Sequence, residues 1–323
     1  MNTVKLQKIT FRHPYLFALG LLVVALGMNF YLQPNLFEQR ILSGNLRIFL
    51  PLMILAAGQA IVIIGGGIDI SVGMIVSMVN ALLVTLITRD SATSDIVVAI
   101  ALSLGAGMLA GALNGMCVAL LRLQPIITTY ATGFVFAGIA LWILPRPGGL
   151  MPAELTKLYR SNPLGVPLTI WVAVVIILLW IGLRATRAGR YLFAVGGQPA
   201  AAYATGVPVT LVRFSTYVIA GVMSALAALA LTLSTGTGDP RIGEAMTLPS
   251  VVAVVLGGTR LSGGQGGIAG SLMGVVILGS IRNIISFASV PTWWQTFVDA
   301  SIIIVALAGP GLVRLIRKQG WSS

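Results

Sequence analysis

The chain has 323 residues, of which 57% are hydrophobic and only 9% are charged, and its formal net charge is +12. This composition excludes an ordinary soluble domain, in which about a quarter of the residues are charged. Apolar runs of about 20 residues, the length that an α-helix needs to cross a bilayer, recur along the chain. The sequence therefore predicts an all-α polytopic membrane protein with the lipid bilayer as its surroundings.

We expect about ten transmembrane helices, and their ranges are 14–32, 46–64, 70–88, 96–120, 126–144, 168–184, 213–235, 248–258, 268–285 and 294–309. The eighth range is too short to cross a bilayer alone. Either the glycine-rich segment after it lies at membrane depth, or the span is broken. Irregular backbone is tolerated at that depth only where protein or water surrounds it.

The basic residues set the orientation, because cytoplasmic loops of membrane proteins carry an excess of Lys and Arg. They lie in short loops and at both ends without clustered aromatic residues, so nucleic acid is not expected as a partner. With the N-terminus inside, most of them are cytoplasmic. We therefore expect a cytoplasmic segment 1–13, a transmembrane domain 14–309 and a cytoplasmic tail 310–323. The acidic residues of the outer loops are then Glu38, Asp90, Asp95, Glu154, Asp239 and Glu244.

Two connections are long. Residues 145–167 contain several prolines and are expected to form an irregular outer segment. Residues 184–213 form the long cytoplasmic loop. Within it, 199–206 begins with Pro, which suits a first helical turn, and ends with Gly, which stops a helix. This pattern predicts a short helix lying under the membrane.

The segment 65–73, Gly-Gly-Gly-Ile-Asp-Ile-Ser-Val-Gly, separates the second and third expected spans. Its glycines break the helix and allow backbones to approach closely. Asp69 is one of only eight acidic residues, and a carboxylate within apolar sequence is retained for a reason. Two interpretations are compatible: Asp69 or Ser71 caps the next helix, or Asp69 has a direct functional role.

An internal similarity aligns residues 66–73 with residues 257–264, and each copy lies between two apolar spans. Transporters often consist of two related halves with interrupted helices at matching positions. The span count places both copies on the inner side, whereas an inverted repeat would place them on opposite sides. A two-repeat architecture is therefore possible.

Catalytic motifs are lacking. Residues 261–265 spell the Leu-Ser-Gly-Gly-Gln signature of ATP-binding-cassette (ABC) ATPases, but the phosphate-binding Gly-x-x-x-x-Gly-Lys-Ser/Thr loop does not occur, and nor does any Gly-Lys pair. With one His and one Cys, Cys117, no metal cluster is expected. The sequence predicts a protein that is not an enzyme and binds no cofactor or metal.

Uncharged polar side chains within the spans offer hydrogen-bond donors and acceptors to a hydroxyl-rich solute. Together with Asp69, the candidate solute-pathway residues are Gln59, Asn80, Asn114, Thr128, Thr129 and Asn283. For any single one of them, a hydrogen bond between helices is the simpler interpretation. As a set, they fit a polar pathway better than an ion-coupled one. Gly107, Gly111 and Gly115, spaced by four, predict a face for close helix packing.

These motifs, taken in order, resemble the membrane permeases of ribose-type ABC sugar importers, in the branched-chain-amino-acid/ribose permease superfamily. The resemblance covers residues 46–309 and rests on Gly66–Gly73, Asn114-Gly115, the segment 125–129, the loop 189–207 and the segment 253–264. Pro199 and Pro249 depart from the family pattern, which tends to have an acidic residue at the first position and an aspartate at the second.

The resemblance implies a bacterial inner-membrane subunit that moves a sugar or sugar-like solute from periplasm to cytoplasm. Its partners would be a second permease subunit, a periplasmic sugar-binding protein and a separate cytoplasmic ATPase, which would use ATP and Mg²⁺. The loop 184–213 would dock on that ATPase. The residues that the resemblance assigns to this coupling are Arg190, Gly196, Gly197, Gln198, Ala201, Ala202 and Gly206.

Two other functions remain open at this stage. The first is a secondary transporter of a small polar solute driven by an ion gradient, for which Asp69 and Asp299 would be the coupling acids. The second is a scaffold or channel subunit without active transport. The structured basic loop 184–213 favours an ATP-driven importer subunit, because a secondary transporter needs no element that docks on an ATPase.

Overall fold

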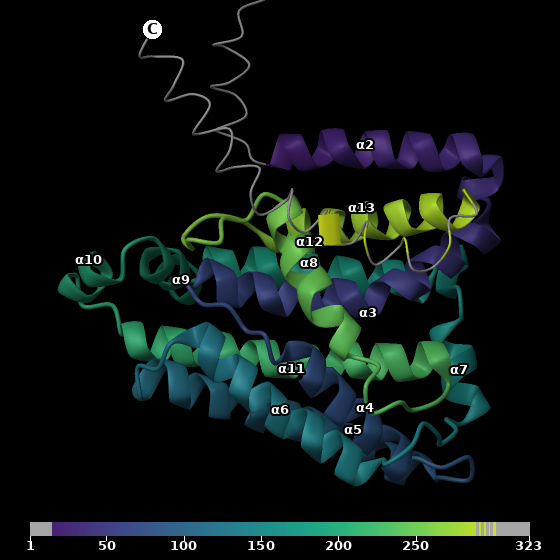
Figure 1. Ribbon diagram of the computed structural model, residues 1–323, viewed down its shortest axis with the longest axis horizontal. Helices are drawn as coiled ribbons and strands as arrows, with labels where there is room; N and C mark the ends of the chain where they lie inside the picture. The colour runs from purple at the N-terminus through teal and green to yellow at the C-terminus, as the bar shows by residue number, and fades with distance from the viewer. Residues whose placement is uncertain (1–14, 289–290, 292–293, 295–296, 298–299, 302–323) are drawn as a thin grey trace, which may run out of the picture.

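The computed structural model describes residues 15–288, 291, 294, 297 and 300–301. In this part of the chain all regular structure is helical, apart from an isolated β-bridge between Gly148 and Gly238 (Figure 1). The α-helices are α2 (Tyr15–Leu32), α3 (Gln39–Ile64), α4 (Val72–Leu86), α5 (Thr93–Gly115), α6 (Pro125–Ile143), α7 (Ala153–Tyr159), α8 (Leu168–Ala185), α9 (Arg187–Gly197), α10 (Pro199–Ala204), α11 (Val209–Thr235), α12 (Thr247–Leu256) and α13 (Ile268–Phe287). The shorter helical turns are η1 (Pro34–Phe37), η2 (Met116–Leu120), η3 (Pro163–Gly165) and η4 (Glu244–Met246).

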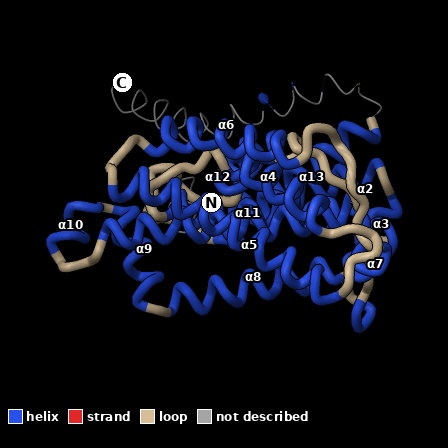
Figure 2. Tube along the Cα trace, turned by 90° about the horizontal axis from the view of Figure 1, so that it is seen from below, coloured by secondary structure: helices blue, strands red, loops and turns tan. Residues whose placement is uncertain are grey.

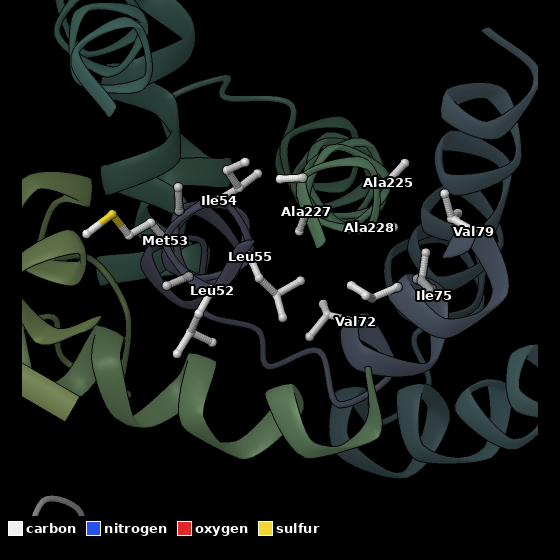
Figure 3. Packing of buried hydrophobic residues seen from close by; sticks show 14 of the residues in the cluster. Leu52, Met53, Ile54, Leu55, Val72, Ile75, Val79, Ala225, Ala227 and Ala228 are labelled. Carbon is white, nitrogen blue, oxygen red and sulfur yellow. The ribbon is translucent and has the colours of Figure 1, made fainter. Parts of the chain in front are cut away.

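The long helices run roughly side by side, and α9 and α10 lie at one end of the bundle, here called the α10 end (Figures 1 and 2). The short helix α7 lies at the opposite end, here called the α7 end. Helix α3 occupies the centre, since every residue from Leu50 to Ile64 is buried. Figure 3 shows Leu55 of α3 directed toward Val72 at the start of α4, and Ile54 beside α11. A helix segment that is buried on all sides, as residues 50–64 are, belongs in the core of a membrane bundle.

Helices α5 and α11 pack through small residues. A Cβ added at Gly107 would collide with the Gly221 carbonyl, and one at Gly111 would lie 3.0 Å from the Gly221 Cα. A Cβ at Gly115 would lie 2.8 Å from the carbonyl oxygen of Phe214. The predicted glycine face is therefore confirmed. It allows the two backbones to approach more closely than side chains would permit.

Six helices in the described ranges are long and apolar enough to cross a membrane: Gln39–Ile64, Thr93–Leu120, Pro125–Ile143, Leu168–Ala185, Val209–Thr235 and Ile268–Phe287. The apolar segments Ala18–Leu32, Val72–Leu86 and Glu244–Leu256 are shorter. The architecture agrees with an all-α polytopic membrane protein, but the count of ten spans is not confirmed. The tenth expected span, 294–309, and the two expected tails, 1–13 and 310–323, lie outside the described residues.

Two spans are broken. Helix α4 has 15 residues, or about 22 Å, which is shorter than the hydrocarbon core of about 30 Å. The expected third span, 70–88, is therefore not one continuous crossing helix, and the irregular segment 65–71 precedes it. Helix α12 has 10 residues, and the irregular segment before it, 236–246, lies along α4. Gly238 lies against Val84, and Gly243 lies against Val76.

An irregular segment packed beside α4 therefore precedes α12, on the N-terminal side of the eighth expected span. Of the two alternatives left open for residues 248–258, the structure agrees with a broken span, and the glycine-rich segment after it does not extend α12. Residues 257–267 instead connect α12 to α13 at the α10 end, beside the last residues of α3 and α9. The sequence does not predict that segment 236–246 packs beside α4, because it contains Asp239, Arg241 and Glu244 and therefore resembles an exposed loop.

Both long connections contain helices. The segment 145–167, expected to be irregular, includes α7 and η3. The short helix expected over 199–206 is confirmed as α10, which begins at Pro199. Helix α9 was not predicted, although Thr186 is a normal helix-capping residue. Its hydroxyl accepts a hydrogen bond of 3.3 Å from the Gly189 N–H.

The internal similarity corresponds to two matching helix ends. Gly66, with φ +84°, and Gly258, with φ +86°, follow α3 and α12 in the left-handed conformation. In each copy, the N–H of this glycine and the N–H of the next residue donate hydrogen bonds to two carbonyls of the last helical turn. This arrangement is the Schellman cap. The matching conformations pair Gly66 with Gly258 and Gly65 with Gly257. The sequence alignment pairs Gly66 with Gly257, so the two differ by one residue. Both copies lie at the same end, as the span count required, because Gly264 N–H donates to the Ile64 carbonyl at 2.9 Å.

The α5–α11 contact predicts opposite effects for two glycines of α5. Gly111→Ala should destabilise the protein by about 1–3 kcal/mol, because the new methyl group collides with the Tyr217 carbonyl. Gly105→Ala should be neutral or stabilising by up to about 1 kcal/mol, since nothing lies within 4 Å of its Cβ position. Thermal unfolding in detergent measures both. Equal melting temperatures for the two variants would contradict the described packing.

Candidate functional site

A buried polar cluster surrounds Asp69, whose side chain is fully buried. Its Oδ1 accepts hydrogen bonds from the Ser71 N–H at 2.8 Å and from the Ser71 hydroxyl at 2.7 Å. Its Oδ2 accepts a bond of 3.4 Å from the Asn114 amide nitrogen, which also donates to the Ser71 hydroxyl at 2.7 Å. Thr132 donates to the Asn114 carbonyl oxygen at 2.6 Å. The cluster thus joins the segment 65–71 to α5 and α6.

The position of Asp69 follows from the local chain. The Schellman cap ends α3, and α4 begins only at Val72, so the backbone between them has unpaired N–H groups. The carboxylate accepts one of these, and the Ile70 N–H donates to the Thr129 hydroxyl at 3.0 Å. Asp69 therefore stabilises the turn that precedes α4, which agrees with the capping interpretation in position. Its negative charge also lies at the positive end of the α4 dipole.

Thr128 and Asn80, two further predicted pathway residues, serve other contacts. The Thr128 hydroxyl donates to the Gln124 carbonyl of its own helix at 2.8 Å. Asn80 donates to the Thr232 hydroxyl at 2.7 Å and accepts a bond of 2.8 Å from the Asp239 N–H. Asn80 thereby ties α4 to the end of α11 and to the irregular segment 236–246.

Gln59 and Asn283 are not brought into the Asp69 cluster. Gln59 is completely buried on α3, and neither of its amide atoms has a hydrogen-bond partner in the described part of the chain. Asn283 is half-buried on α13, which packs mainly against α2, α3 and α12. Of the predicted pathway residues, the structure therefore gathers only Asp69, Asn114 and Thr129.

Three glycine-rich segments meet at the α10 end. They are the segment after α3, the end of α9 and the turn between α12 and α13. A Cβ at Gly196 would collide with the Ile64 carbonyl, one at Gly263 would lie 2.9 Å from the Gly66 Cα, and one at Gly264 would lie 2.5 Å from the Gly197 Cα. We call these residues, 64–66, 196–197 and 263–264, the glycine junction. Backbone contacts backbone there, with no side chain between.

Helices α9 and α10 form a small unit of their own beside this junction. Val195, Ala202 and Val207 are buried together, whereas Arg190, Gly197, Gln198, Ala201 and Gly206 are exposed. Ala202, which we expected to contact a partner, has 5% exposure and holds α10 against α9. The accessible surface of α10 instead includes Ala201 and Tyr203, and the Tyr203 side chain is 76% exposed.

Sequence reasoning missed several polar residues. Ser71 and Thr132 belong to the Asp69 cluster, Ser77 holds the segment 236–246, and Thr232 accepts a hydrogen bond from Asn80. Thr132 follows Thr129 by three residues, which places both on one face of α6. This spacing could have identified it. Ser77 carries no such signal, because one serine in an apolar helix ordinarily bonds to its own backbone.

Comparison with known proteins gives the chain a family. The model of the family described as branched-chain amino acid transport system / permease component matches residues 41–307. The ribose import permease protein RbsC of Bacillus subtilis (strain 168) is 35% identical over 300 residues, which cover 90% of this chain and 89% of that protein. RbsC of Escherichia coli (strain K12) is 32% identical over 292 residues, covering 88% and 90%.

A more distant relative belongs to a different import system. The autoinducer 2 import system permease protein LsrD of Photorhabdus temperata is 28% identical over 321 residues, covering 96% of this chain and 95% of that protein. No solved structure matches the chain significantly. The resemblance inferred from the glycine motifs is confirmed by these matches, since the described helices and the aligned relatives extend over nearly the whole sequence. The chain belongs to the branched-chain amino acid transport system / permease component family, within which it is a ribose-type ABC permease.

Proposed function

We propose that the chain is the permease subunit of a bacterial inner-membrane ABC importer and moves a sugar or sugar-like polar solute from periplasm to cytoplasm. Both termini are then cytoplasmic. The subunit pairs with a second permease subunit, receives the solute from a periplasmic sugar-binding protein and is driven by a separate ATPase through the loop 184–213. The relatives named for ribose and autoinducer 2 import support a solute of this class.

The observation that carries this proposal is the glycine junction. Helix α10 is the most projecting element of its end of the bundle (Figure 1), and its Ala202 is buried with Val195 of α9 and with Val207. The last residues of α9, Gly196 and Gly197, lie directly against the turns that follow α3 and α12. A displacement of α9–α10 by an ATPase therefore reaches both turns without an intervening side chain. An ion-driven transporter would require no such connection.

The Asp69 cluster lies on the far side of one of these turns. Only three residues separate Gly65 from Asp69, and Asp69 holds the start of α4 through Ser71. We propose that motion of the junction is transmitted to α4 by this rigid turn. Asp69, Asn114 and Thr129 then act as positioning residues for the pathway rather than as groups that contact the solute in this conformation, because all three are buried.

We propose the exposed surface of α10 as the docking surface for the ATPase, and this predicts different outcomes for substitutions at two neighbouring residues. Ala201→Glu should abolish co-purification of an ATPase with the detergent-solubilised permease, because Ala201 lies on the exposed surface of α10. The wild-type protein, purified from its native host, should retain an ATPase that contains a phosphate-binding loop. Ala202→Glu should instead lower the thermal stability of the permease itself, since a buried charge disrupts the α9–α10 unit. Purification of the wild-type protein without any ATPase in mild detergent would contradict the proposed function.

The junction predicts a second contrast, between Gly196 and Gly197. Gly196→Ala should reduce the binding-protein-stimulated ATPase activity of the assembled complex to its basal rate, because the methyl group forces α9 away from Ile64. Gly197→Ala is the matched control, since no atom lies within 4 Å of its Cβ position, and it should retain stimulation. The measurement is ATP hydrolysis with and without the binding protein. Full stimulation of the Gly196→Ala complex would refute the transmission route.

The Asp69 cluster predicts that an exchange of the side chains at positions 69 and 114 restores stability lost in a single variant. Asp69→Asn should destabilise the permease by about 1–3 kcal/mol, since its new amide N–H group faces the N–H group of Asn114 and one buried group loses its partner. The exchange variant Asp69→Asn with Asn114→Asp restores one carboxylate and one amide and should recover much of the melting temperature. Equal stability of the single variant and the wild type would show that the cluster contributes little, and a transport defect would then require another cause.

A further inference from the structure

Glu244 lies at an unexpected depth. The sequence placed it in an outer loop, but the preceding residue, Gly243, donates its N–H to the Ser77 hydroxyl of α4 at 2.9 Å. The carbonyl oxygen of Gly243 lies directly against Gly73, and so closely that no Cβ would fit there. Residues 243–244 are therefore fixed beside the first two turns of α4.

The start of α4 is in turn level with the middle of a membrane-spanning helix. A Cβ added at Gly133 would lie 3.5 Å from the Ser71 Cα and 3.6 Å from the Met74 sulfur. Gly133 is near the centre of α6, which runs from Pro125 to Ile143. Glu244, which follows Gly243 directly, consequently lies near the middle of the bundle along its length.

At this depth, Glu244 and Ala245 are exposed on η4. No ion pair involves Glu244 within the described residues. A carboxylate facing hydrocarbon is strongly unfavourable, and intramembrane acids normally face a polar interior or a water-filled space. The backbone gives independent evidence, because irregular structure at membrane depth is tolerated only where protein covers it or water reaches it. Both features agree with an exposed side of η4 that faces water.

We infer that the exposed surface of η4, formed by Glu244 and Ala245, lines the aqueous path of the solute at mid-membrane depth. This inference rests on the proposed function in that the chain conducts a polar solute. Glu244 supplies a carboxylate whose oxygens accept hydrogen bonds from the hydroxyl groups of a polyhydroxylated solute. The Asn80 and Ser77 bonds hold the segment 236–246 in place, and with it η4, on which Glu244 is exposed.

Cysteine labelling tests the assignment. In a Cys117→Ala background, which removes the only native thiol, Glu244→Cys is treated in membrane vesicles with a charged, membrane-impermeant methanethiosulfonate reagent. Thiols react as thiolates, which form in water and not in hydrocarbon, so the labelling rate reports water access. Leu178→Cys is the control, because Leu178 lies near the middle of α8 and is 60% exposed on an apolar face.

The expected result is that Glu244→Cys reacts at least about ten times faster than Leu178→Cys, because only the first thiol ionises readily. Ala245→Cys measures water access to η4 without removal of the carboxylate. It provides the test if the Glu244→Cys variant fails to insert into the membrane. Labelling of Ala245→Cys as slow as that of Leu178→Cys would overturn the inference. The assay requires neither ATP nor a partner protein. A failure of ATPase coupling therefore leaves its outcome unchanged, and the two proposals fail separately.

Discussion

Direct contact between backbones, possible only where side chains are missing, determines how this bundle is assembled. Gly107 and Gly111 of α5 meet Gly221 of α11, and the glycine junction brings the ends of α3, α9 and the α12–α13 turn together. Helices in a bilayer gain little from hydrophobic association, because lipid tails are as apolar as leucine. Close van der Waals contact and hydrogen bonds must therefore supply most of the free energy of helix association. In this protein the glycines create the contacts, and the same contacts place the loop 184–213 against the membrane-spanning part.

The second constraint is the satisfaction of backbone polar groups in the two broken spans. Each break exposes N–H and C=O groups at a depth where water is scarce. Asp69, Thr129, Asn80 and Ser77 accept hydrogen bonds from backbone N–H groups of these segments. Several polar residues that composition alone would assign to a solute path therefore stabilise the fold. The bonds from Asn80 and Ser77 also fix η4, whose exposed surface we propose as part of the solute path.

The sequence predicted the helical membrane architecture, the break at 65–73, the glycine face of α5 and helix α10. Each of these leaves a local signal, such as an apolar run, a spacing of four or a proline followed by a glycine. The path of 236–246 could not be predicted in this way, because its place beside α4 depends on bonds from Asn80 and Ser77, which are distant in sequence. The same holds for Ala202, whose inward direction is decided by Val195 and Val207. The repeat register was missed by one residue because the run of glycines at 65–67 permits two alignments, and only the capping hydrogen bonds distinguish them.

The glycine junction also has a mechanical consequence. Most helix contacts in proteins pass through side chains, which change rotamer and absorb small displacements. At Gly196 and Gly264 there is no such compliant layer, and the peptide planes of three segments bear on one another directly. The junction is therefore stiff under compression. A small shift of α9 would therefore be transmitted to the ends of α3 and α12 rather than absorbed by side-chain rearrangement, which suits the role that we propose for the loop 184–213.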